Sequence, residues 1–196
     1  MLIGLTGSFG AGKSTVLEIF KDYGVLTISA DRIVKELLEH QEIKQQVVSL
    51  LGNVLDDYGH LDKKKIAALV FNDGSLRARL EGILHPAVIE KIIAYHKAHQ
   101  NQLVVAEIPL LFEGNYDKIV DKIVTVTSRK ELVYERLSAK KGFLEEEISK
   151  RLYAQLPDEI KQRRAHFLID NSQDINHCKK QVLAVINILY QKKYGL

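Results

Sequence analysis

MLIGLTGSFGAGKS, residues 1–14, is the stretch that decides the fold. Residues 1–6 form a short apolar run, typical of a buried strand, and residues 13–23 carry apolar side chains at helical spacing. The glycine-rich residues between them match the pattern G-x-x-x-x-G-K-[ST]. A glycine turn between a strand and a helix directs backbone N–H groups and the positive end of the helix at a phosphate. The stretch therefore predicts a phosphate-binding loop.

The residue types in this loop match the parts of a nucleoside triphosphate. Lys13 is predicted to reach the β- and γ-phosphates. Ser14 is predicted to ligate magnesium, with Asp31 or Glu107 contributing through water. Thr15 stands where it reaches the α-phosphate region. We therefore predict ATP and Mg²⁺ as cofactors, with the phosphates bound by Gly10, Ala11, Gly12, Lys13, Ser14 and Thr15.

Strand and helix patterns alternate along the rest of the chain. Apolar runs predict further strands at residues 25–29, 103–108, 119–126 and 167–169. Helices are expected at residues 30–51, 63–71, 76–84, 87–99, 129–137 and 174–191, with a new helix starting at Pro86. Such alternation favours a parallel sheet with right-handed crossovers. We predict a three-layer α/β/α fold with five parallel strands and the phosphate-binding loop at their carboxyl edge.

Composition excludes several other classes of protein. The single cysteine, Cys178, rules out an intrachain disulfide and suits a reducing compartment. The first residues lack the basic region of a secretory signal, and no apolar run has the length of a membrane span. The net charge of +3 is spread among acidic residues, which gives no nucleic-acid signature. We expect a cytoplasmic protein with no nucleic-acid or membrane partner, either a monomer or a weak homo-oligomer.

Two carboxylates are candidates for chemistry near the loop. A kinase needs a group that accepts or orients the proton of the acceptor hydroxyl. Asp31 directly follows the predicted second strand, at the same edge as the loop, although Ser29 or Asp31 capping the next helix is the alternative. Glu107 ends the predicted third strand, and either holds a magnesium-bound water or only contacts the loop.

Phosphoryl transfer also needs cations over the transferred group, usually on a segment that closes over the site. Arg136, Lys140 and Lys141 open a charged stretch that we interpret as a lid. A solvated helix face stabilised by Glu–Lys pairs is the alternative, and the sequence leaves open which cation acts.

A GTP-binding switch is the main rival within the phosphate-loop class. Residues 56–59 read Asp-Asp-Tyr-Gly and match its D-x-x-G pattern, but no apolar strand precedes them and no N-K-x-D pattern follows. Asp and Gly are ordinary turn formers, so we interpret these residues as a turn.

Several blocks resemble the dephospho-coenzyme A kinase family along almost the whole chain. The most specific is Ile-Pro-Leu-Leu-Phe-Glu at residues 108–113. The others, in the family's order, are the opening at residues 3–7, Ser-Ala-Asp at 29–31, residues 62–71, Leu-His-Pro at 84–86, residues 151–155 and Ile-Asp-Asn at 169–171. The resemblance implies transfer of the ATP γ-phosphoryl group to the 3′-hydroxyl of dephospho-coenzyme A, which is the last step of coenzyme A synthesis.

The resemblance also implies three parts and a role for each. A nucleotide-binding core takes in residues 1–34, 100–138 and 165–196, an acceptor domain residues 35–99, and a lid residues 139–164. Catalytic roles fall on Asp31, Lys13, Arg136 and Lys140, and Asn171 lies beside the adenine, next to Asp170. The acceptor is bound by Asp31, Lys35, His85, Pro86, Pro109, Leu110 and Leu111.

A few positions depart from the family pattern. Ser29 stands in place of an acid, which leaves Asp31 to act alone, and His166 stands in place of another Asp. Lysine replaces arginine at Lys35, Lys63 and Lys140. Lysine keeps the charge but loses the planar fork that grips a phosphate.

Three other functions compete with this one. A nucleoside or nucleotide kinase has the same three parts, but it does not explain residues 108–113. A nucleotide-dependent switch would turn over ATP with no acceptor, and a nucleic-acid-binding module would rest on the net charge alone.

Overall fold

The computed structural model describes residues 1–194, except for the side chains of Asn72, Lys140, Lys141 and Tyr194. Its contacts divide the chain into two compact units, one of Met1–Ser29 with residues 98–194 and one of Ala30–Lys97. The first unit holds β1 (Leu2–Gly7), α1 (Lys13–Asp22), β2 (Leu26–Ser29), β3 (Val104–Glu107), η1 (Tyr116–Ile119), β4 (Lys122–Thr127), α6 (Lys130–Lys141), α7 (Glu145–Tyr153), α8 (Asp158–Arg164), β5 (Phe167–Asp170) and α9 (Ile175–Tyr194). The second holds α2 (Ala30–Leu37), α3 (Gln41–Leu51), α4 (Lys63–Asn72) and α5 (Gly74–Ala98), whose last residue belongs to the first unit.

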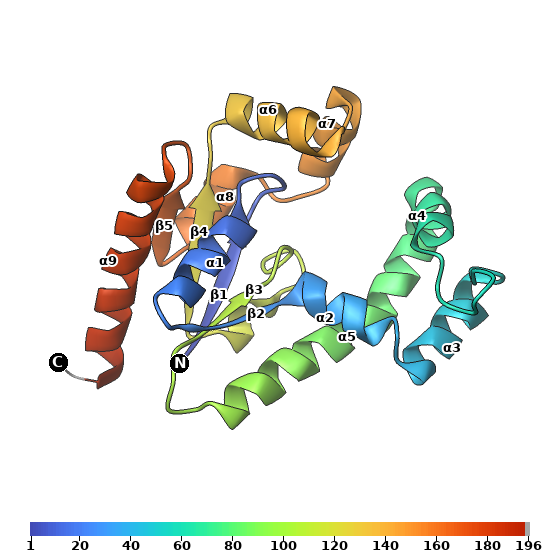
Figure 1. Cartoon of the computed structure of the whole chain (residues 1–196), viewed down its shortest axis with the longest axis horizontal. Helices are drawn as coiled ribbons and strands as arrows, with labels where there is room; N and C mark the ends of the chain where they lie inside the picture. The colour runs from blue at the N-terminus through green and yellow to red at the C-terminus, as the bar shows by residue number, and fades with distance from the viewer. Residues whose placement is uncertain (195–196) are drawn as a thin grey trace. The chain divides into compact units, whose positions relative to one another are not determined.

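A five-stranded parallel sheet forms the first unit, in the order β2-β3-β1-β4-β5 (Figure 1). Successive side chains of a strand point to opposite faces, and β4 shows this clearly. Val124 and Val126 join a core with α1 and α9, whereas the hydroxyl of Thr125 donates to a carbonyl of α8. Helices therefore cover both faces, and the predicted three-layer α/β/α class with five parallel strands is confirmed.

The second unit is helical, and two of its predicted helix boundaries were wrong. The expected helix 30–51 is two helices, because residues 38–40 make a tight turn and His40 is extended before α3. No glycine or proline marks that break. The expected break at Pro86 does not occur, because α5 runs through it with Leu84 and Val88 buried on either side. Pro86 has no N–H to donate to the Gly82 carbonyl. Both residues are exposed, so that carbonyl faces water.

The charged stretch at residues 140–164 contains two helices with different surroundings. Ile148 of α7 is buried with Val133 and Leu137 of α6. In contrast, α8 packs on β4, and the side chain of Lys161 is completely buried. Among the described helices, none has both the length and the apolar character needed to cross a membrane.

Candidate active site

The phosphate-binding loop leaves the central strand β1 and enters α1. Gly10 and Gly12 have φ angles of +80° and +94°, in the left-handed region that favours glycine. A Cβ atom on Gly12 would collide with the side-chain amide of Asn171, so this position also needs glycine for space. No side chain caps the start of α1, which is the arrangement of helix starts that bind anions.

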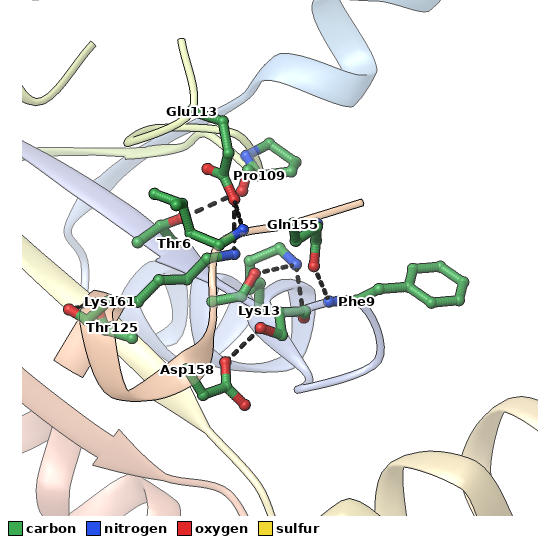
Figure 2. Close-up of polar contacts among 12 residues, drawn as sticks. Thr6, Phe9, Lys13, Pro109, Glu113, Thr125, Gln155, Asp158 and Lys161 are labelled. Carbon is green, nitrogen blue, oxygen red and sulfur yellow. Dashed lines mark hydrogen bonds and ion pairs between the residues drawn. The ribbon is translucent and has the colours of Figure 1, made fainter. Parts of the chain in front are cut away.

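Lys13 lies folded against its own loop. Its Nζ atom donates to the carbonyl oxygens of Gly7 at 3.0 Å and Ser8 at 3.1 Å (Figure 2). The loop also has an internal turn, in which Ala11 N–H donates to Ser8 O at 3.1 Å. The ammonium group therefore sits within the loop, and its contact with the β- and γ-phosphates stays a prediction.

Glu107 links the loop to the neighbouring strand ends. It lies at the end of β3, opposite Leu5 and Ser29, and is only 4% exposed. One of its carboxylate oxygens accepts from Ser14 Oγ at 3.1 Å and the other from Ser29 Oγ at 3.0 Å. Ser29, which departs from the family pattern, thus donates to Glu107. The contact between Glu107 and the loop, one of the two alternatives from the sequence, is present.

Asn171 and Arg136 lie on the other side of the loop. The Asn171 side chain donates to Ala11 O at 2.9 Å, and Arg136 donates to Asn171 O at 2.8 Å and to Ser128 Oγ at 3.3 Å. These bonds place the guanidinium group beside Gly12. The Asp170 carboxylate instead accepts from Ser172 N–H in a local turn.

Residues 109–111, which follow β3, contact the strand that leads into the loop. Pro109 O accepts from Thr6 Oγ1 at 3.2 Å, next to the start of the loop. Leu111 is completely buried against Gly4, so it is a core residue, and Leu110 is half-buried.

The remaining predicted site residues belong to the second unit or lie outside the description. Asp31 and Lys35 are exposed on α2, and Asp31 stands two residues after Ser29. His85 and Pro86 lie inside α5. The Lys140 side chain lies outside the described part of the chain, so its predicted role has no structural test.

Four residues that the sequence analysis did not single out hold the loop and its support. Asp158 Oδ1 accepts from Ser8 Oγ, and Gln155 Oε1 accepts from Phe9 N–H at 2.8 Å (Figure 2). The two others form a buried ion pair, Glu113 with Lys161. Only Gln155 and Glu113 lay in blocks noted for the family resemblance, and no local pattern indicated any of these contacts.

The site has oxygen donors for a hard cation. Within residues 1–194 no group of three His, Cys, Asp or Glu side chains is placed to hold a metal by itself. The donors beside the loop are the Ser14 hydroxyl and the Glu107 carboxylate, which are the ligand types that magnesium prefers when phosphates complete its shell.

Comparisons with known proteins find related sequences and structures. The family profile for dephospho-CoA kinase matches residues 1–177. Dephospho-CoA kinase of Mesorhizobium japonicum is 36% identical over 192 residues, which cover 96% of each chain. The crystal structure of TT1252 from Thermus thermophilus has a TM-score of 0.85 and 28% identity, covering 96% of this chain and 97% of that one. Dephospho-CoA kinase from Campylobacter jejuni has a TM-score of 0.72 and 29% identity, covering 97% and 98%.

A parallel sheet with helices on both faces and this loop at its carboxyl edge defines a P-loop nucleotide-binding protein, and the related structures fall in the P-loop kinases. Within that class, the profile covers most of the chain and the relatives span nearly all of it. The chain belongs to the dephospho-CoA kinase family and is an ATP-dependent kinase.

Proposed function

We propose that this chain transfers the γ-phosphoryl group of ATP to the 3′-hydroxyl group of dephospho-coenzyme A and releases coenzyme A and ADP. The observation that carries the proposal is the loop itself. Its lysine lies within the loop and its serine donates to the buried Glu107 carboxylate, in a chain whose family match covers residues 1–177. The reaction is the last step of coenzyme A synthesis.

The loop supplies the binding of ATP phosphates in this proposal. Backbone N–H groups of residues 10–15 and the uncapped start of α1 hold the phosphates. Lys13 Nζ turns from the carbonyl oxygens of Gly7 and Ser8 toward the β- and γ-phosphates. Arg136 and Asn171 contact the nucleotide from the side of Gly12, and Lys140 adds a further cation.

Magnesium fits the oxygen donors beside the loop. Ser14 ligates the ion and Glu107 holds one of its waters, in place of the hydrogen bond between the two side chains. When bound, magnesium neutralises charge that develops on the β- and γ-phosphates. Asp31 is the alternative partner for this water.

Asp31 acts as the base in the transfer. The acceptor oxygen forms a bond to the γ-phosphorus, the bond between that phosphorus and the β–γ bridging oxygen breaks, and the acceptor proton moves to the Asp31 carboxylate. Chain connectivity supports this role, because Asp31 stands two residues after Ser29, whose hydroxyl donates to Glu107.

The acceptor-binding roles in this proposal are those that the family resemblance implies. Lys35, with its positive charge, pairs with acceptor phosphates, and Pro109 and Leu110 form a wall beside the loop. His85 and Pro86 line the rest of the acceptor site. Leu111 shapes this wall from the core, where it is completely buried. We keep a cytoplasmic location and a monomeric or weakly associated state as predictions.

The test is ADP release from Mg-ATP, measured by a coupled assay with and without dephospho-coenzyme A. AMP and adenosine serve as control acceptors, and Lys13→Met serves as the control for a contaminating kinase. Release that depends on dephospho-coenzyme A and disappears in Lys13→Met supports the proposal. Equal release with AMP would assign the chain to the nucleotide kinases, and release that ignores every acceptor would assign it to the switches.

A further inference from the structure

We propose that residues 155–161, which we name the brace, hold the phosphate-binding loop in its binding shape, and that Gln155 and Asp158 are positioning residues for ATP binding. The brace follows α7 and includes the first turn of α8. The inference rests on the nucleotide binding proposed above. It concerns affinity for ATP and is independent of the acceptor.

The brace binds the outward side of the loop. Ser8 and Phe9 are the first two variable positions of the G-x-x-x-x-G-K-[ST] pattern, and neither residue pairs in the sheet. Asp158 accepts from the Ser8 hydroxyl, and Gln155 accepts from the Phe9 N–H at 2.8 Å. These two bonds fix the start of the loop from outside, and the order of the backbone N–H groups that follow Phe9 depends on that fixed start.

A second set of contacts holds the same loop residue. The Arg151 guanidinium lies 5.2 Å from the centre of the Phe9 ring and 4.8 Å from that of Phe143. The two rings meet edge to face with their centres 5.5 Å apart. The ring and the backbone of Phe9 are thus both held by the segment that ends in the brace.

The brace is itself anchored to the sheet layer. Lys161 is 0% exposed, and its Nζ lies 3.0 Å from Glu113 Oε1, which also accepts from Leu156 N–H at 2.9 Å. The Lys161 carbonyl accepts from Thr125 Oγ1 of β4 at 3.4 Å. Figure 2 shows Glu113, Lys161 and Asp158 arranged along one side of the loop. Because these contacts fix the brace to the sheet, Gln155 and Asp158 hold Ser8 and Phe9 at a defined position.

Removing the charge of Asp158 distinguishes positioning of the loop from direct electrostatic repulsion of ATP. A carboxylate near bound phosphates repels them, so its removal strengthens ATP binding if charge is the only effect. Positioning of the loop by Asp158 predicts the opposite result, weaker ATP binding when the carboxylate is removed. Glu159 is the next residue of α8, is exposed and lines the same pocket beside the loop, so Glu159→Ala is a matched loss of charge.

The experiment is calorimetric binding of Mg-ATP to the full chain, with thermal melting as a measure of folding. We expect Ser8→Ala and Asp158→Ala each to weaken binding about tenfold, and the double variant to be no weaker than either single variant. Asp158→Asn keeps an acceptor oxygen for Ser8 and should regain most of the affinity. Glu159→Ala should not weaken binding.

Several outcomes would overturn the inference. They are tighter ATP binding by Asp158→Ala, additive losses in the double variant, or a loss in Glu159→Ala equal to that in Asp158→Ala. If Asp158→Ala does not fold, Gln155→Leu decides, because it removes the acceptor of Phe9 N–H without changing charge. Unchanged affinity in Gln155→Leu would then contradict the proposal. Failure of dephospho-coenzyme A as acceptor would leave all these results unaffected.

Discussion

Replacing Lys161 by methionine tests the anchor of the brace. The change keeps an unbranched side chain, shorter by one atom, and removes the charge together with the ammonium N–H donors. It leaves the Glu113 carboxylate near a buried site with Leu156 N–H as its remaining donor. Breaking a buried ion pair by removal of one partner costs about 3–5 kcal/mol of unfolding free energy. Because Glu113 is 18% exposed and keeps one hydrogen bond, we expect about 2–3 kcal/mol for Lys161→Met.

The reverse change should cost more. Glu113→Gln leaves the Lys161 ammonium without its countercharge at 0% exposure. The limit for such a change is the upper end of the cost of breaking a buried ion pair, which is about 5 kcal/mol. The pair is held mainly by charge, because neither Lys161 Nζ nor Glu113 Oε2 has a well-aligned hydrogen bond within the described chain. We therefore expect a loss between that of Lys161→Met and this limit.

The double variant Lys161→Met/Glu113→Gln places two neutral groups together and should lie within about 1 kcal/mol of the wild type. Urea unfolding at pH 7, followed by circular dichroism, measures all four proteins and gives the coupling energy of the pair. A coupling energy of at least about 2 kcal/mol is expected. A cost below about 1 kcal/mol for Lys161→Met, or a double loss equal to the sum of the single losses, would refute the reasoning.

Three further predictions concern single side chains. Asp31→Asn should lose most turnover and retain affinity for Mg-ADP within about twofold, measured by calorimetry; turnover within a few-fold of wild type would remove Asp31 as the base. Arg136→Ala should reduce kcat/KM for ATP by about 10- to 100-fold, and an effect confined to the KM of dephospho-coenzyme A would place Arg136 in the acceptor site. Burial, with help from Lys122 and Lys192, lowers the pKa of His166, whose neutral Nδ1 accepts from Ile123 N–H. The neutral His166 side chain therefore contributes to the free energy of unfolding above the ordinary histidine pKa of about 6.5, and this contribution is lost as the pH falls below it. Between pH 7.5 and 5.5 the wild type should lose more stability than His166→Asn. Parallel curves of unfolding free energy against pH would contradict this.

The part of the site that the sequence predicted is local in the chain. The strand, the glycine turn and the helix of the loop are neighbours, and their pattern sets their structure. Glu107 was also found, because it ends an apolar strand at the carboxyl edge, whereas Asn171 was named only through the family resemblance. Residues at that edge come together in any parallel sheet.

The parts that the sequence missed depend on tertiary packing. Pro86 stays inside α5 because a buried stripe continues on both sides of it, and that stripe outweighs a local rule. Lys161 stands in a charged stretch that reads as a solvated helix face, and its partner Glu113 comes from the segment after β3. Asp158 meets Ser8 across 150 residues of sequence. No periodicity reports contacts at such separations.

The cation that acts on the transferred phosphoryl group stays a prediction, and the partners of three arginines bear on it. Arg151 lies over the rings of Phe9 and Phe143, and Arg164 pairs with Asp117 while covering the ring of Phe112. Both would have to leave these partners to reach a phosphate. Arg136 already lies beside Gly12, where its bond to the Asn171 carbonyl fixes its direction. Because a fixed planar guanidinium grips phosphate oxygens better than a lysine does, we expect Arg136 to compensate for the lysine at position 140.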